Sequence, residues 1–275
     1  MARSWPFYNL PVLLYRLGPE GFYAARDEEG VLRSLYSDPF EVRPGGWEFG
    51  REVALDEMGL LPPVRPGKIV GVGRNYLDHA AELGNEMPTE PLLFLKAPSS
   101  VIGPRSPIVL PPESTHVEFE GEIAVVVRHR LTRATAEEAR GGILGVTGAC
   151  DVTARDLQRS DATFARGKSF DTFCPLGPAI QVEPDLDDLT VVTRVDGVER
   201  QRGHVGDMAW GPIEQLVFIS RMMTLEPGDV VLTGTPAGVG RLESGQEVEV
   251  EVTSVGTLAN RVEAQVEAKV EEQIG

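Results

Sequence analysis

Short apolar segments divided by turn residues make up the first part of the chain. Residues 10–36 separate into PVLLYRLG, GFYAARDEEG and VLRSLY, each with the length and composition that favour a β-strand. The run Asp27-Glu28-Glu29-Gly30 between two of these segments is typical of a hairpin turn. Residues 37–66 are rich in proline, glycine and charge, which is typical of a linker. We therefore expect a small N-terminal domain over residues 1–65 and a larger domain over residues 66–275.

The larger domain has mainly strand patterns. In order along the chain these are KIVGVG, PLLFLK, HVEFEGEIAVVV, GILGVTGACDV, VVLTGTP and EVEVEVTSVGTLANRV. Helical patterns are fewer: RNYLDHAAELG, which Gly84 ends, and TAEEAR around residues 135–140. Because strands outnumber helices and do not alternate with them, the pattern disfavours a doubly wound sheet and predicts an α+β, sheet-dominated fold.

An acidic composition narrows the possible partners. The chain has 42 acidic and 26 basic residues, which gives a formal net charge of -16. Nucleic-acid binders need a basic surface, so this balance argues against a nucleic-acid partner. An acidic surface also repels anionic substrates at long range. An anionic substrate would therefore need a concentrated local positive charge, such as a bound cation.

Cysteine usage and hydropathy favour the cytoplasm. Cys150 and Cys174 are too few for a disulfide framework, which indicates a reducing compartment. The apolar run FYNLPVLLY near the N-terminus is broken by Asn9 and Pro11. No uninterrupted apolar stretch reaches the roughly 20 residues that span a bilayer. We expect a cytoplasmic protein with no membrane partner.

The segment HVEFEGEIAVVV, residues 116–127, carries the most informative polar pattern. Glu118, Glu120 and Glu122 alternate with apolar or small residues, so on a strand the three carboxylates share one face. The strand runs into IAVVV, which is typical of a buried central strand, where carboxylates need partners or a metal. The alternative is a solvated acidic face. For the similar run EVEVEV at 247–252 we adopt that alternative.

Asp151 distinguishes the first acidic segment from the second. It follows the small, apolar run GAC, where a strand would end, and strand ends are where loops collect functional groups. Two glutamates and an aspartate without a histidine or cysteine cluster form a hard oxygen site. We therefore predict one Mg²⁺ or Mn²⁺ ion per subunit, held by Glu120, Glu122 and Asp151.

Two further segments carry groups that suit acid–base or charge chemistry. Lys168 lies between Gly167 and an aromatic, proline-containing loop, which favours a shaped site over the usual exposed lysine. His79 and Glu82 lie three apart on a predicted helix and share a face, so they could orient a water or move a proton. The alternative for this pair is an ordinary helix-surface contact.

Taken together, six segments resemble the fumarylacetoacetate hydrolase family, in particular its bacterial branch of hydroxyheptadienedioate isomerases and acylpyruvate hydrolases. They are GVGRNYLDHAAELG, PLLFLKAPSSVIGP, VEFEGEIAVVV, DVTARDLQRSD, GKSFDTFCPLGP and LEPGDVVLTGTPAGVG. The segments occur in the family's order and cover residues 68–260.

The resemblance implies a role for each matched position. It implies metal ligation by Glu120, Glu122 and Asp151, catalysis by His79, Glu82 and Lys168, and substrate contact by Arg74, Gln158 and Thr235. Glu118 matches no ligand of the family. The additional upstream acidic ligand of the longer eukaryotic hydrolases has no match here, which argues against fumarylacetoacetate itself as the substrate. The resemblance further implies a mixed β-roll core and a homodimer.

Several readings of the function remain open. A dinucleotide site is disfavoured because Tyr76 replaces the third glycine of the G-x-G-x-x-G pattern. A non-catalytic metal and carboxylate-binding protein on the same scaffold is the rival from another class. Within the enzyme reading, a small-molecule 2-oxo acid could undergo C–C hydrolysis, isomerisation or, as in an oxaloacetate decarboxylase, decarboxylation. We also expect residues 74–86 to close over the bound substrate.

Overall fold

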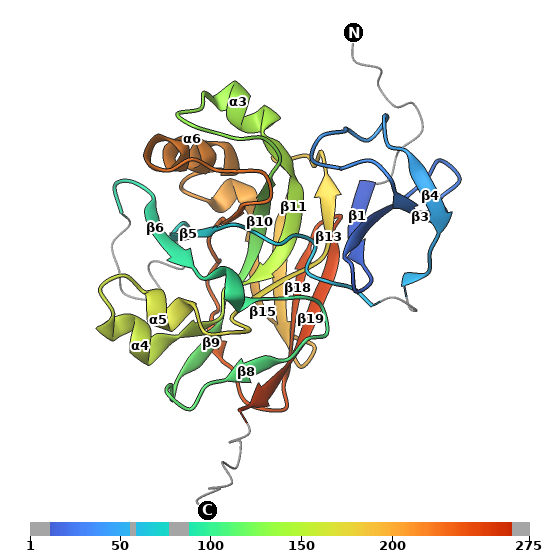
Figure 1. Cartoon of the computed structure of the whole chain (residues 1–275). Helices are drawn as coiled ribbons and strands as arrows, with labels where there is room; N and C mark the ends of the chain where they lie inside the picture. Colours follow the sequence, from blue (N-terminus) through green and yellow to red (C-terminus); the bar gives the residue numbers. More distant parts are fainter. Residues whose placement is uncertain (1–11, 56–58, 77–87, 266–275) are drawn as a thin grey trace, which may run out of the picture.

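Strands dominate the part of the chain that the computed structural model describes, residues 12–55, 59–76 and 88–265. They form three sheets, with a few short helices around them (Figure 1). The expected α+β, sheet-dominated fold is therefore confirmed. Within the described ranges, no helix has the length and apolar composition needed to cross a bilayer.

The largest sheet has 11 strands, and its middle strands are fully buried. In spatial order it runs β4 (Phe49–Glu52), β3 (Leu32–Leu35), β2 (Phe22–Arg26), β1 (Val12–Leu17), β13 (Cys174–Val182), β11 (Ile143–Cys150), β10 (Gly121–Val127), β16 (Val230–Leu232), β5 (Ile69–Gly73) and β6 (Leu92–Lys96), with β7 (Val101–Ile102) beside β13. Every residue of β10 and β11 is buried, because both faces of these central strands are covered.

The N-terminal strands continue this sheet. β1 pairs antiparallel with β13, in a register that places Val12 opposite Val182. β2 and β3 form the expected hairpin around Asp27, whose Oδ1 accepts hydrogen bonds from the backbone N–H groups of Glu29 and Val31. In Figure 1 these blue strands lie at one side of the molecule. The division between residues 65 and 66 into two domains remains a prediction.

A second sheet of five strands packs against the first. It contains β15 (Val198–His204), β14 (Thr190–Val195), β18 (Glu247–Val252), β19 (Gly256–Ala264) and β8 (Ile108–Leu110). In β18 the three valines are buried, while the glutamates are exposed or half-buried. The EVEVEV segment is therefore an amphipathic strand, and its valines belong to the same core as Val125 and Val146 of the first sheet.

The remaining elements lie at both ends of the central strands (Figure 1). A three-stranded sheet contains β12 (Thr153–Ala154), β9 (Val117–Phe119) and β17 (Gly240–Arg241). The helices are α3 (Ala136–Gly141), α4 (Arg155–Ser160), α5 (Ala165–Lys168) and α6 (Pro212–Met222), with short 3-10 turns η1 (Pro98–Ser100) and η2 (Val205–Asp207). α3 connects β10 to β11, whereas α4 and α5 follow the other end of β11. The helix expected around residues 135–140 is α3, and a reciprocal capping box between Thr135 and Glu138 fixes its start.

Candidate active site

The acidic segment that the sequence presents as one strand is divided in two at Glu120. Glu118 lies on β9 and Glu122 on β10, and Glu120 occupies the break between them. β10 and β11 pair antiparallel with Gly121 opposite Cys150, so Asp151 follows directly beside the break. The Asp151 N–H donates to the Glu120 carbonyl oxygen at 2.8 Å. Strand register therefore brings together carboxylates that are some thirty residues apart in the chain.

Glu120, Glu122 and Asp151 form a buried cluster. One carboxylate oxygen from each residue lies within 4.8 Å of the others. All three side chains are almost fully shielded from solvent. Buried carboxylates gathered this closely repel one another unless positive charge is shared among them. The cluster is thus a set of hard oxygen donors that could hold a divalent cation.

Each carboxylate of this cluster has one oxygen held by a buried donor. The contacts are Arg155 Nη2 to Glu120 Oε1 at 2.7 Å, Lys96 Nζ to Asp151 Oδ1 at 2.6 Å, and the Gly234 N–H to Glu122 Oε2 at 2.6 Å. These donors fix the orientation of the three carboxylates. The second oxygen of each group faces the shared space of the cluster, where an ammonium group or a metal ion could contact it.

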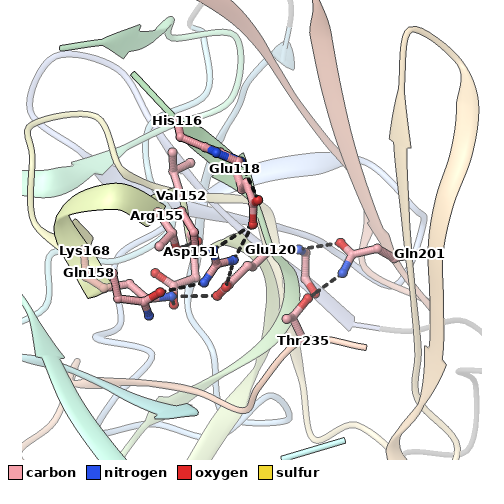
Figure 2. A network of polar contacts seen from close by, with 12 residues as sticks. His116, Glu118, Glu120, Asp151, Val152, Arg155, Gln158, Lys168, Gln201 and Thr235 are labelled. Atoms are coloured by element: carbon pink, nitrogen blue, oxygen red, sulfur yellow. Dashed lines mark hydrogen bonds and ion pairs between the residues drawn. The ribbon is translucent and has the colours of Figure 1, made fainter. Parts of the chain in front are cut away.

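Lys168 identifies the point at which two of those second oxygens converge. Its Nζ donates to Glu120 Oε2 at 2.6 Å and to Asp151 Oδ2 at 2.5 Å (Figure 2). Burial lowers the pKa of Lys168, but the charges of Asp151 and Glu120 outweigh burial and leave that pKa raised. The side chain therefore stays an ammonium group at neutral pH. It also lies 4.8 Å from the centre of the Phe94 ring, within the range of a cation–π contact.

Glu122 is the carboxylate least well neutralised. Burial raises its pKa well above the usual value, and the charges of Asp151 and Glu120 raise it further. Lys168 and the Gly234 N–H act in the opposite direction without cancelling these effects. A divalent cation would relieve the repulsion and favour the ionised form. The donor set and its electrostatics thus fit the expected metal.

A cavity of about 360 Å³ opens beside the cluster. The carboxylates and Lys168 line it, and so do Arg74, Gln158 and Thr235, the three positions predicted to contact substrate. Leu92, Phe94 and Phe164 supply an apolar wall. The structure therefore gathers seven of the nine predicted site residues around one cavity. His79 and Glu82 lie outside the described residues.

Thr235 faces this cavity with its hydroxyl hydrogen already used. Its Oγ1 donates to the Gly121 carbonyl oxygen at 2.9 Å and accepts from Gln201 Nε2 at 2.8 Å (Figure 2). Gln201 Oε1 in turn accepts from the Gly121 N–H at 2.9 Å. A hydroxyl has one hydrogen, so Thr235 can only accept a further hydrogen bond through its side chain. Gln201 thus connects the turn after β16 to the glycine between Glu120 and Glu122.

Three buried residues of the site were missed by the sequence analysis: Lys96, Arg155 and Gln201. Lys96 ends the strand-like run PLLFLK. A charged residue at the end of an apolar strand could have identified it as a candidate site residue. Arg155 follows Asp151 by four residues within the quoted segment DVTARDLQRSD. Gln201 had no signal, because its importance comes from contacts with Thr235 and Gly121, which are distant in sequence.

The sequence of this chain matches one protein-family model and several known proteins. The family model described as "Fumarylacetoacetate (FAA) hydrolase C-terminal" matches residues 68–263. A protein of Archaeoglobus fulgidus, described only as uncharacterized, is 45% identical over 227 residues, which are 82% of this chain and 91% of that protein. The human protein named oxaloacetate tautomerase FAHD2A, mitochondrial, is 40% identical over 215 residues, covering 74% of this chain and 68% of its own length.

Similarity extends to experimentally solved structures. The crystal structure of 2-hydroxyhepta-2,4-diene-1,7-dioate isomerase from Mycobacterium marinum superposes with a TM-score of 0.82 at 38% identity. The match covers 92% of this chain and 99% of that one. The match therefore extends beyond the residues that the family model spans.

Proposed function

The chain belongs to the fumarylacetoacetate hydrolase family, whose members are enzymes acting on small molecules, and on that premise we propose that it is a divalent-metal-dependent enzyme of 2-oxo acids. One observation carries the proposal: three buried carboxylates, each fixed by a separate donor, converge with Lys168 at the base of a cavity. Glu120, Glu122 and Asp151 would hold one Mg²⁺ or Mn²⁺ ion per subunit. When bound, the cation supplies positive charge that stabilises the enolate form of a 2-oxo acid.

Other residues around the cavity would bind the substrate and add positive charge beside it. Lys168, an ammonium ion shielded from water, adds positive charge next to the reacting oxygens. Thr235 offers a hydrogen-bond acceptor, and Gln158 and Arg74 offer donors at the cavity wall. Leu92, Phe94 and Phe164 form the apolar part of the cavity wall, and beside it fewer water molecules compete for these polar contacts. Together they would fix the position of the 2-oxo acid for reaction.

C–C hydrolysis of an acylpyruvate is the first candidate reaction. It requires an activated water in addition to charge stabilisation, and we propose that His79 and Glu82 supply that activation. The support is the spacing of the pair and the resemblance of its segment to the family. The relatives' names favour a second candidate, isomerisation of a 2-hydroxydiene dicarboxylate or keto–enol isomerisation of oxaloacetate. Decarboxylation of oxaloacetate is a third candidate, which rests only on the enolate that it would share with the other two reactions.

A substrate panel tests the proposal. Acylpyruvates, oxaloacetate and 2-hydroxyhepta-2,4-diene-1,7-dioate would be assayed with Mg²⁺ and with Mn²⁺, with and without a chelator. We expect turnover of at least one class, lost on chelation and restored by the metal. Tight binding of a 2-oxo acid without turnover of any class would instead support a non-catalytic binding protein. Turnover that persists after complete metal removal would contradict the metal role.

Two further proposals follow from the family and the composition. We propose that the enzyme is a homodimer, as the resemblance implies, and that it works in the cytoplasm, as two cysteines in 275 residues favour. Sedimentation equilibrium would measure the mass of the assembly against the 29.9 kDa chain. A mass that stays at one chain across micromolar concentrations would contradict the dimer.

A further inference from the structure

Glu118 lies next to the predicted metal ligands, but it is not a member of the carboxylate cluster that they form. It is on β9, and its side chain is 12% exposed. Its Oε2 accepts from Arg155 Nε at 2.7 Å and lies 2.7 Å from Arg155 Nη2. Its Oε1 lies 2.8 Å from His116 Nε2 (Figure 2). Both carboxylate oxygens therefore have partners, and a role as a fourth metal ligand would require breaking these contacts.

Arg155 connects Glu118 to the substrate cavity. Its side chain is 5% exposed and projects from the first residue of α4. Besides Glu118, its Nη2 donates to Glu120 Oε1 at 2.7 Å, and its Nη1 donates to Gln158 Oε1 at 2.7 Å. One guanidinium thus contacts an acid outside the metal cluster, an acid inside it and the amide that borders the cavity.

This contact determines which end of the Gln158 amide faces the cavity. A guanidinium can only donate hydrogen bonds, so the Gln158 atom that faces Arg155 must be the carbonyl oxygen. The NH₂ group then points away from Arg155. Gln158 is three residues after Arg155, which places both on one face of α4, and both line the cavity. Gln158 therefore presents hydrogen-bond donors to a ligand in the cavity.

The orientation of Arg155 depends in turn on Glu118. Glu118 accepts from Nε and shares Nη2 with Glu120, which holds the guanidinium plane in the position from which Nη1 reaches Gln158. If the Glu118 carboxylate is lost, the buried guanidinium keeps Glu120 as its charged partner in this network. The guanidinium is then held in this network only by Glu120 Oε1 and Gln158 Oε1, and it can rotate about its contact with Glu120. Nη1 would leave Gln158, and the amide could turn its oxygen to the cavity.

We propose that Glu118 is a positioning residue that acts through Arg155 to hold the Gln158 amide as a hydrogen-bond donor to an oxygen of the bound 2-oxo acid. The identity of the ligand rests on the proposed function. The orientation of the amide rests on the contacts alone. Glu118 thereby contributes to substrate affinity without touching either the substrate or the metal.

A double-mutant cycle tests this proposal. The variants are Glu118→Gln, Gln158→Ala and both together, in Mn²⁺-loaded protein. The measurements are KM and kcat for the preferred substrate, the calorimetric affinity for oxalate as an enolate-shaped probe, and the affinity for Mn²⁺ alone. Glu251→Gln is the control, because it alters a more exposed ion pair of the same length, Arg194 Nη1 to Glu251 Oε2 at 2.7 Å, on β18, which contributes no residue to the cavity wall.

We expect Glu118→Gln to weaken oxalate binding and raise KM by about tenfold, the usual effect of one misplaced hydrogen bond. The affinity for Mn²⁺ should fall less than the affinity for oxalate, since all three ligands remain and Glu120 keeps its contact with Arg155. In the Gln158→Ala background, Glu118→Gln should change oxalate affinity no further. Glu118→Asp, which keeps a carboxylate, should recover part of the affinity and serves as the test if Glu118→Gln does not fold.

Additive effects of the two substitutions would overturn the proposal, and so would a loss of Mn²⁺ affinity as large as the loss of oxalate affinity. An unchanged oxalate affinity in Glu118→Gln would also overturn it. Failure of the proposed function has a different signature. In that case wild-type protein turns over no member of the substrate panel. The oxalate affinities of the four proteins in the double-mutant cycle can still be measured and compared.

Discussion

Lys168 Nζ lies 2.5 Å from Asp151 Oδ2, inside the cluster that is proposed to hold the metal. The ammonium therefore contacts an oxygen that a cation would use as well. A metal bound there must share these oxygens with Lys168 or displace it toward the cavity, where a substrate oxygen could accept its hydrogen bonds. Metal affinity and turnover should consequently respond differently when Lys168 is replaced.

We predict that Lys168→Met lowers turnover by about a hundredfold or more, the usual effect of removing a charged donor next to a developing negative charge. The affinity for Mn²⁺ should be equal to that of wild type or higher, because a competing cation is gone. Steady-state kinetics and calorimetry on one preparation check both statements. Loss of metal affinity in parallel with turnover would show that the lysine supports the metal instead.

A second prediction concerns the pH dependence of metal binding. The pKa of Glu122 is raised in the metal-free protein, so this carboxyl holds a proton at pH values where an ordinary glutamate is ionised. Metal binding requires the carboxylate and must release that proton. The affinity for Mn²⁺ should therefore keep increasing as the pH rises above the range in which an ordinary glutamate ionises. Calorimetry in two buffers of different ionisation enthalpy should show net proton release on Mn²⁺ binding, and binding without proton release would contradict this prediction.

The glycine between the two glutamates gives a prediction about stability. A Cβ on Gly121 would overlap Thr193 Oγ1, and Thr193 is fully buried on β14. We expect Gly121→Ala to lower the free energy of unfolding by about 1–3 kcal/mol through overpacking. Gly141 at the end of α3 has no atom near its missing Cβ. Gly141→Ala should therefore leave the free energy of unfolding unchanged or raise it by up to about 1 kcal/mol. Urea unfolding of both variants tests the contrast, and equal losses would contradict it.

His79 separates the candidate reactions. If it activates a water, His79→Ala should depress acylpyruvate hydrolysis by about a hundredfold or more while affecting oxaloacetate decarboxylation much less, since only hydrolysis consumes an activated water. Both rates would be measured on one preparation of the variant. Equal losses would mean that the pair shapes the site generally. No loss in either reaction would assign His79 and Glu82 to the surface-contact alternative.

Local pattern was enough to predict most strands and the three clustered carboxylates. The alternation around Glu120 and the strand end before Asp151 are properties of a few neighbouring residues. Both can be recognised in the sequence because the apolar residues around them indicate buried strands. The break of the acidic strand at Glu120 was not predicted. It depends on β9 leaving the large sheet to pair with β12 and β17, which no local pattern encodes.

Long-range pairing accounts for what the sequence did not show. β1 joins the main sheet through β13, whose paired residues lie about 170 positions further along the chain. Lys96 reaches Asp151 across 55 residues, and Gln201 reaches Thr235 across 34. Glu118 looked like a third member of an acidic face, and the structure shows instead that it binds Arg155, which also binds Glu120.

The location of the metal is the central claim, and the anomalous diffraction of Mn²⁺ in a crystal of this protein tests it most directly. We predict one anomalous peak per chain, in contact with one oxygen each of Glu120, Glu122 and Asp151 and within reach of the cavity that Gln158 and Thr235 line. A Mn²⁺-saturated crystal in which the three carboxylates point apart, or in which the peak lies elsewhere on the chain, would contradict the account.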